Sequence, residues 1–262
     1  VEPFTYYGVF LLVRELDEGR HGLGVNGSAV LRDLDEPYLD AFLMRRSLML
    51  GVDGWTFLDR ERVWSLSGWW GGTTVSGSRQ AVTALQNGYP HYFQRPDADH
   101  LEVNTQADFL SGWSGRVMLN KQKGNFMFNV AVGAISPGFE IRDLGFQSHT
   151  DLINGHVMAG YRSFAAGKVL GSWSVEFMTQ RNYNFDGVKT ADQAMGIETS
   201  LQFLNYWELH LDASVNAGIT DPMRTRGGVS MWQPGNSGFS LWLESDDRKA
   251  LVVEAGFGLR RG

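Results

Sequence analysis

A strict alternation of apolar and polar side chains is the feature that most constrains this chain. From Glu208 to Ala217 the sequence ELHLDASVNA places its leucines, alanines and valine on one face of an extended strand, and Glu208, His210 and Asp212 on the other. Because successive side chains of a strand point to opposite faces, this period of two predicts a β-strand with one apolar and one polar face.

The same pattern recurs along the chain. The stretch 172–185 places Trp173, Val175 and Phe177 opposite polar residues, with aromatic side chains near both ends of its apolar face. Similar alternation is clear in 109–121, 125–135, 195–203 and 251–259, and weaker in 7–14, 23–32, 48–58, 63–71, 155–164, 229–232 and 239–244. These segments predict roughly a dozen antiparallel strands, most with about the 9 to 11 residues that a tilted membrane strand needs.

The polar faces separate two all-β classes. A small soluble barrel fills its interior with aliphatic side chains, whereas a membrane barrel with a wet or plugged lumen carries polar ones. The ionisable side chains expected on the inner wall are Arg116, Glu176, Glu198, His210, Asp212 and Glu254. We therefore expect residues 1–262 to form one domain, an antiparallel transmembrane β-barrel of the bacterial outer membrane that contacts lipid; a soluble all-β fold is the alternative.

Composition excludes several other classes. The 262 residues contain no cysteine, so disulfides, thiolate metal sites and a cysteine nucleophile are ruled out. The net charge of −6, without long basic runs, argues against a nucleic-acid partner. The mean hydropathy of −0.22 is compatible with a membrane barrel, which needs only every second residue apolar. No cofactor or metal is implied.

The expected connections are of two kinds. Short turns are predicted at 121–124, 166–169 and 205–207, and long loops at 73–107 and 136–153. In outer-membrane barrels the short turns face the periplasm. The segment 78–87, SRQAVTALQN, is the one stretch with helical character, and it lies inside the first long loop.

Charged side chains gather in both long loops. Arg95, Asp97, Asp99 and His100 form the densest cluster, which fits a divalent cation or a sugar, or an Arg–Asp network that holds the loop.

In the second long loop, Glu140, Arg142 and Asp143 allow the same interpretations, and we favour structural pairing for both clusters. Pro137 and Gly138 predict a turn with a positive φ at the glycine.

Catalysis is not expected. A lipid-cleaving barrel needs a serine and a histidine that face lipid, whereas His156 and His210 lie on polar strand faces. We therefore expect the chain not to be an enzyme.

Several loop motifs resemble a known family. The segments YFQRPDADH at 92–100, LSGWSG at 110–115 and SPGFEIRDLGF at 136–146 resemble the uncharacterised outer-membrane barrel domain DUF5916, most strongly over 78–160. In that family the barrel commonly follows a β-sandwich similar to a family 9 carbohydrate-binding module. No such sandwich is present here, and the chain ends Leu259, Arg260, Arg261, Gly262 without a terminal aromatic residue. We therefore expect a piece of a barrel, with strands missing at one or both ends.

Two functional hypotheses follow. The first is a pore, scaffold or surface-anchoring component of an envelope assembly, with outer-membrane lipid and other envelope proteins as partners. The second is a carbohydrate-binding or carbohydrate-processing surface protein whose site lies in the long loops; the resemblance to a family fused to a sugar-binding-like module is its support.

Overall fold

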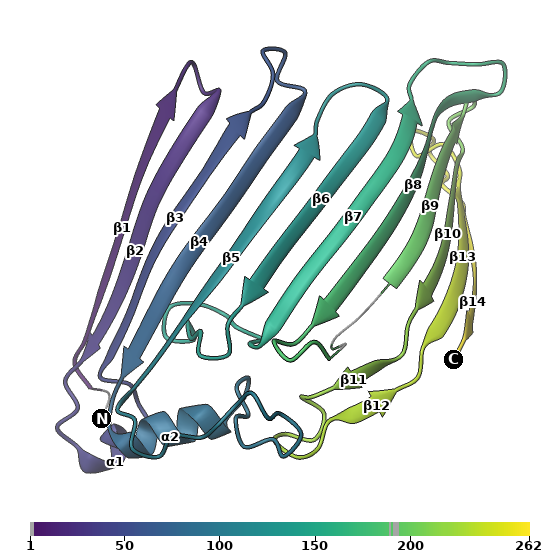
Figure 1. The fold of residues 1–262 in the computed structure, drawn as a ribbon. Helices are drawn as coiled ribbons and strands as arrows, with labels where there is room; N and C mark the ends of the chain where they lie inside the picture. The colour runs from purple at the N-terminus through teal and green to yellow at the C-terminus, as the bar shows by residue number, and fades with distance from the viewer. Residues whose placement is uncertain (1–2, 189, 191–193) are drawn as a thin grey trace.

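The computed structural model describes residues 3–188, 190 and 194–262. Within this part, twelve strands form one antiparallel sheet in which almost every strand pairs with its neighbours in sequence (Figure 1). They are β1 (Thr5–Leu16), β2 (His21–Arg32), β3 (Arg46–Phe57), β4 (Trp64–Ser76), β5 (Phe109–Lys121), β6 (Phe126–Ile135), β7 (Leu152–Ser163), β8 (Leu170–Tyr183), β9 (Ala194–Phe203), β10 (Glu208–Asn216), β13 (Asn236–Glu244) and β14 (Glu254–Arg261). The all-β antiparallel expectation is confirmed.

A separate hairpin interrupts the sheet order. The short strands β11 (Ile219–Asp221) and β12 (Met231–Gln233) pair with each other between β10 and β13. The strand predicted from the weak alternation over 229–232 is present as β12, but it belongs to this hairpin and not to the main sheet. The segment is too short for its alternation to distinguish the two.

The strand register divides the sheet into an apolar face and a polar face. Phe177 pairs with Ile197, Ile197 with Ala213, Ala213 with Phe239, and Phe239 with Leu259. Directly opposed residues share a face, so one apolar row crosses β8, β9, β10, β13 and β14.

The neighbouring row is polar. Glu176 pairs with Glu198, Glu198 with Asp212, and Asp212 with Ser240. The alternation expected from sequence therefore holds across strands as well as along them. Below, the face with Phe177 is the outer face and the face with Glu176 is the inner face.

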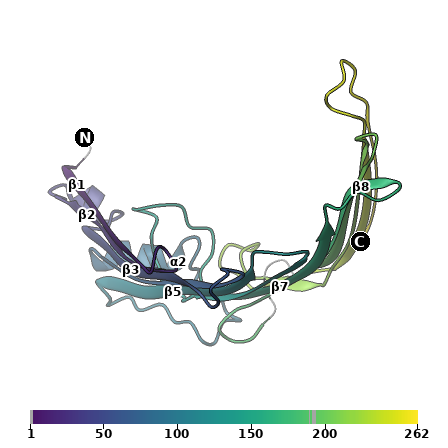
Figure 2. The same cartoon turned by 90° about the horizontal axis from the view of Figure 1, so that it is seen from above.

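The sheet is strongly bent but not closed. Figure 2 shows a trough whose edges, β1 and β14, stand far apart, and each of these strands pairs with one neighbour only in the described structure. The expectation of a closed barrel is thus met only as far as a curved antiparallel wall. Closure requires a partner for the free backbone groups of both edges.

The connections sort to the two ends of the strands, as expected. Short turns at 17–20, 58–63, 122–125, 164–169, 204–207 and 245–253 form one end, called here the short-turn end. The longer connections 33–45, 77–108, 136–151 and 217–235 form the other, the long-loop end, shown at the bottom of Figure 1.

Two helices lie at the long-loop end. The expected helix is α2 (Arg79–Asn87), whose N-cap Ser78 accepts a hydrogen bond from the backbone N–H of Ala81 at 3.2 Å. A one-turn helix, α1 (Pro37–Asp40), was not predicted. In the described residues no helix has both the length and the apolar character needed to span a membrane.

A small core anchors α2 to the sheet. Ala81 and Val82 of the helix pack with Met44 and with Val75 of β4, and Leu110 of β5 lies against this cluster. Val75 and Leu110 are directly paired and share the face of Arg116, so the helix covers the inner face. Figure 2 shows α2 on the concave side of the trough.

Candidate functional site

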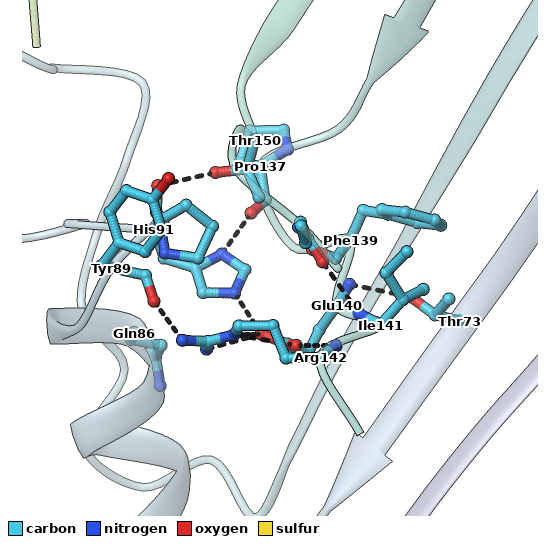
Figure 3. Close-up of polar contacts among 12 residues, drawn as sticks. Thr73, Gln86, Tyr89, His91, Pro137, Phe139, Glu140, Ile141, Arg142 and Thr150 are labelled. Atoms are coloured by element: carbon cyan, nitrogen blue, oxygen red, sulfur yellow. Dashed lines mark hydrogen bonds and ion pairs between the residues drawn. The ribbon is translucent and has the colours of Figure 1, made fainter. Parts of the chain in front are cut away.

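The long-loop assembly, defined as residues 77–108 and 136–151, is the candidate site because it holds most of the buried ionisable side chains among the described residues. His91 is fully buried, and its Nε2 lies 2.9 Å from Glu140 Oε2 while its Nδ1 lies 2.8 Å from the carbonyl oxygen of Pro137 (Figure 3). Both ring nitrogens thus face oxygen atoms, which hold the imidazole from two sides.

Glu140 is the centre of this first cluster. It accepts from Arg142 Nη2 at 2.7 Å, from the Arg142 backbone N–H at 2.6 Å and from His91 (Figure 3). Burial acts to raise the pKa of Glu140, but the hydrogen bonds from His91 and Arg142 outweigh it and lower the pKa to about 2. The backbone N–H of Glu140 donates to Thr73 Oγ1 at 3.1 Å, which ties the cluster to β4.

A second buried cluster joins the two loops. Arg95 Nη2 donates to Asp151 Oδ2 at 2.9 Å, and the side chains of Arg95 and Asp151 are 2% and 3% exposed. His100 Nε2 lies 2.9 Å from both oxygens of the same carboxylate, and the Phe185 backbone N–H donates to Oδ1 at 3.0 Å. Asp151 holds a φ of +54°, a strained value for a residue other than glycine.

A third cluster fastens the second loop to the sheet. Arg32 of β2 forms a bidentate pair with Asp143, at 2.9 Å and 2.8 Å. The hydroxyl of Ser47 on β3 also donates to this carboxylate. The planar guanidinium matches the carboxylate fork, so this pair fixes the orientation of the loop as well as its position.

The structure distributes the residues of the sequence-predicted clusters among separate contacts. Arg95 and His100 meet at Asp151, Glu140 pairs with Arg142, and Asp143 pairs with Arg32. Asp97 instead accepts from the backbone N–H of Ser230 at 2.8 Å, and Asp99 is exposed. Within the described ranges no group of three or more metal-ligating side chains is found.

Sequence reasoning missed His91, Asp151 and Arg32, the partners that complete the three clusters. Each lies far from its partner in the sequence. His91 is 49 residues from Glu140, and Asp151 is 56 residues from Arg95. Arg32 and Asp143 are 111 residues apart. No local spacing signals such pairs.

The prediction of a positive φ at Gly138 is wrong, because the glycines with positive φ in the described structure are Gly19, Gly124, Gly187 and Gly227. A turn does form, with the Phe139 N–H donating to the Ser136 carbonyl at 3.1 Å. Glycine is required at 138 for another reason: a Cβ there would lie 2.3 Å from the carbonyl oxygen of Ser111 on β5. The loop backbone lies directly against the sheet at this point.

A polar cavity of about 260 Å³ opens beside the second cluster. It is lined from three connections, by Arg95, by 149–152 and by 221–224, and also by Gln233 of β12. Asp221 accepts from Gln233 Nε2 at 2.6 Å and from the backbone N–H of Met223 at 2.8 Å. The exposed Arg224 adds a guanidinium to the lining.

The predicted lumen-facing residues all lie on the inner face, but their surroundings differ. Arg116 donates to Asn154 Oδ1 at 3.0 Å and to His156 Nδ1 at 2.9 Å, and His156 Nε2 reaches Asn129 Oδ1 at 2.6 Å. This network crosses β5, β6 and β7.

The remaining lumen-facing residues form an acidic tract over β8 to β14. Glu176, Glu198 and Asp212 are directly opposed in one row, and Glu208, Glu244 and Glu254 in another. His210 lies on β10 between the two rows, 3.5 Å from Glu208. Opposed like charges repel, so this tract concentrates negative potential on the inner wall.

Replacing Arg95 tests whether the second cluster holds the long-loop assembly. Arg95→Met leaves the Asp151 carboxylate buried without its guanidinium, and we expect the free energy of opening of this assembly to fall by about 3 to 5 kcal/mol. Hydrogen exchange over residues 91–104 measures the change. Asp99→Asn, in the same loop but exposed, is the matched control and leaves exchange unchanged; equal protection in Arg95→Met contradicts a holding role.

Acidification tests the first cluster. Because the pKa of Glu140 is lowered from 4.5 to about 2, its contribution to stability is complete above pH 4.5 and is lost as the pH falls toward 2. Glu140→Gln removes this contribution at every pH. We therefore expect the stability difference between wild type and Glu140→Gln, about 3 kcal/mol at neutral pH, to shrink between pH 4.5 and pH 2. Hydrogen exchange over 136–151 reports it, and a difference independent of pH refutes the assignment.

Comparison with known proteins places this geometry in a family. No curated protein matches the chain. A family model described as a domain of unknown function, DUF5916, matches residues 72–261. The match covers the whole long-loop assembly and the sheet from the end of β4 to β14, and it leaves out β1 to β3. This match extends over well more than half of the chain and includes the motifs at 92–100, 110–115 and 136–146. The chain therefore belongs to the DUF5916 family.

Proposed function

We propose that this chain forms part of the wall of a bacterial outer-membrane β-barrel that acts without catalysis, as a pore, scaffold or surface-anchoring component of an envelope assembly. The observation that carries the proposal is the pair of neighbouring rows on opposite faces. Phe177 to Leu259 forms an apolar row on the outer face, while Glu176 to Ser240 forms a polar row on the inner face.

The exposure of the outer face favours lipid as its environment. Ile197 is 50% exposed and Leu259 61% exposed, and the outer-face side chains Leu50 and Val132 are exposed at 56% and 59%. Soluble monomers rarely expose contiguous apolar surface on this scale. Strands of up to 14 residues are also long enough to cross a bilayer at a tilt.

The free edges fit the same proposal. Unpaired backbone groups are costly in lipid, so β1 and β14 must each pair with a further strand in the membrane. The described sheet is then one part of a closed wall. The long-loop assembly, packed on the inner face at β4 and β5, narrows or braces the interior at the long-loop end.

A pair of adjacent substitutions on β10 tests the membrane assignment. Leu211→Arg places a charge on the outer face, and we expect a loss of about 2 to 4 kcal/mol in folding stability in lipid vesicles if this position lies near mid-membrane. His210→Arg, one residue away on the inner face, is tolerated. Denaturant unfolding after vesicle reconstitution measures both, and equal effects of the two substitutions refute the proposal.

A second candidate function, glycan binding at the long-loop end, is favoured by the polar cavity beside Asp151. Its mixed lining of guanidinium, carboxylate and amide groups is of the kind that binds sugar hydroxyls and acidic sugar groups.

Arg224→Ala tests glycan binding. We expect it to abolish binding of trigalacturonate, an acidic oligosaccharide, without changing the melting of the protein, because a lining guanidinium pairs with carboxylate. Calorimetric titration measures binding. Arg226→Ala, two residues along the same connection and outside the cavity lining, is the control. Absence of binding by the wild type removes this candidate for acidic glycans.

A further inference from the structure

The outer face carries an apolar notch near the short-turn end of β2 to β5. Its volume is about 480 Å³. Gly54 of β3 and Gly68 of β4 are directly paired at its centre, and because neither carries a side chain, the sheet surface is recessed there. The outer-face side chains that surround the recess are Leu23, Val52, Leu66, Trp70 and Val117.

The neighbouring backbone leaves no room for a side chain at either glycine, so the recess follows from the structure of the sheet itself. A Cβ at position 54 would lie 2.7 Å from the carbonyl oxygen of Gly22, and a Cβ at position 68 would lie 2.9 Å from that of Arg116. Both distances fall below any ordinary contact between a Cβ and a carbonyl oxygen, so a larger residue at either position would push neighbouring strands apart.

An exposed arginine flanks the notch on its β1 side. Arg14 of β1 pairs directly with Leu23, a wall residue, and is exposed on the outer face. Lys121 of β5 lies on the opposite flank, but its Nζ donates to the carbonyl oxygens of Lys123 and Phe126 and lies over the Phe126 ring, away from the notch. His21 contacts Thr56 of the notch lining at 2.6 Å, and Asp17 Oδ2 lies 3.5 Å from His21 Nε2.

We propose that this notch binds a glycerophospholipid, with one acyl chain in the recess and the phosphate beside Arg14. The inference rests on the membrane assignment above. An acyl chain fits because the recess is apolar and continuous with the outer face. A phosphate fits because the exposed Arg14 guanidinium stands three residues before the short turn at 17–20, where a headgroup would meet water, and such juxtamembrane cations attract anionic lipid.

A matched pair of substitutions tests the recess. Val52→Phe fills it, whereas Val132→Phe adds the same ring to an equally apolar outer-face position on β6 outside the notch. In native mass spectrometry with added dipalmitoyl phosphatidylglycerol, we expect wild type and Val132→Phe to retain one lipid, and Val52→Phe to bind it about tenfold more weakly. Equal retention by all three proteins overturns the proposal.

The phosphate contact is tested separately. Arg14→Gln is expected to bind phosphatidylglycerol no better than dipalmitoyl glycerol, which has the same chains and no phosphate, while wild type and the control Lys121→Gln prefer the phospholipid. A preference that survives in Arg14→Gln overturns the headgroup assignment.

Flotation with vesicles separates failure of this inference from failure of the membrane assignment. If wild type floats but Val52→Phe keeps its lipid, the notch is not a lipid site and the membrane role stands; if wild type does not float, both fail. Should Val52→Phe not fold, equimolar phosphatidylglycerol with brominated chains provides a second measurement on wild type. Fluorescence quenching that disappears in Trp70→Phe supports the notch, and quenching that is unchanged in this variant contradicts it.

Discussion

The two-residue period of the strands is the constraint on which the rest of this structure depends. Once the ladder sets Phe177 opposite Ile197 and Glu176 opposite Glu198, every neighbouring strand must continue one apolar and one polar face. A slip of one residue would exchange the two faces of a strand. The register is therefore held by the preference of whole rows for an apolar or a polar environment, and not by single contacts.

The long-loop assembly is held in place by a different kind of interaction. Its backbone leaves the ladder, so its position is set by charge clusters that span the two loops and the sheet, at Glu140, Asp151 and Asp143. The carboxylates of Glu140 and Asp151 are buried and that of Asp143 is partly exposed, and each is compensated by several donors. Such clusters are costly to break from one side, because the remaining charge stays buried without its partner. They give the assembly one position on the inner face.

The two faces of the sheet suggest separate tasks. The inner face bears the polar network at Arg116 and the acidic tract around Glu198, and the long-loop assembly packs on it at β4 and β5. The outer face bears the apolar rows and the notch at Gly54 and Gly68. In the proposed membrane setting, solutes or partners meet the inner face and lipid meets the outer one, and the edges at β1 and β14 are the places where the wall continues.

The sequence by itself determined the all-β class, the antiparallel strands, the sorting of short and long connections, the helix after Ser78 and the shared face of Arg116, Glu176 and Asp212. All of these follow from local periodicity, capping and loop length. The tertiary structure alone decided that Arg95 pairs with Asp151 and not with Asp97, that Gly138 is needed for close approach to Ser111, and that the described sheet remains open. These features depend on contacts between residues far apart in the chain and on the curvature summed over twelve strands, neither of which a local pattern contains.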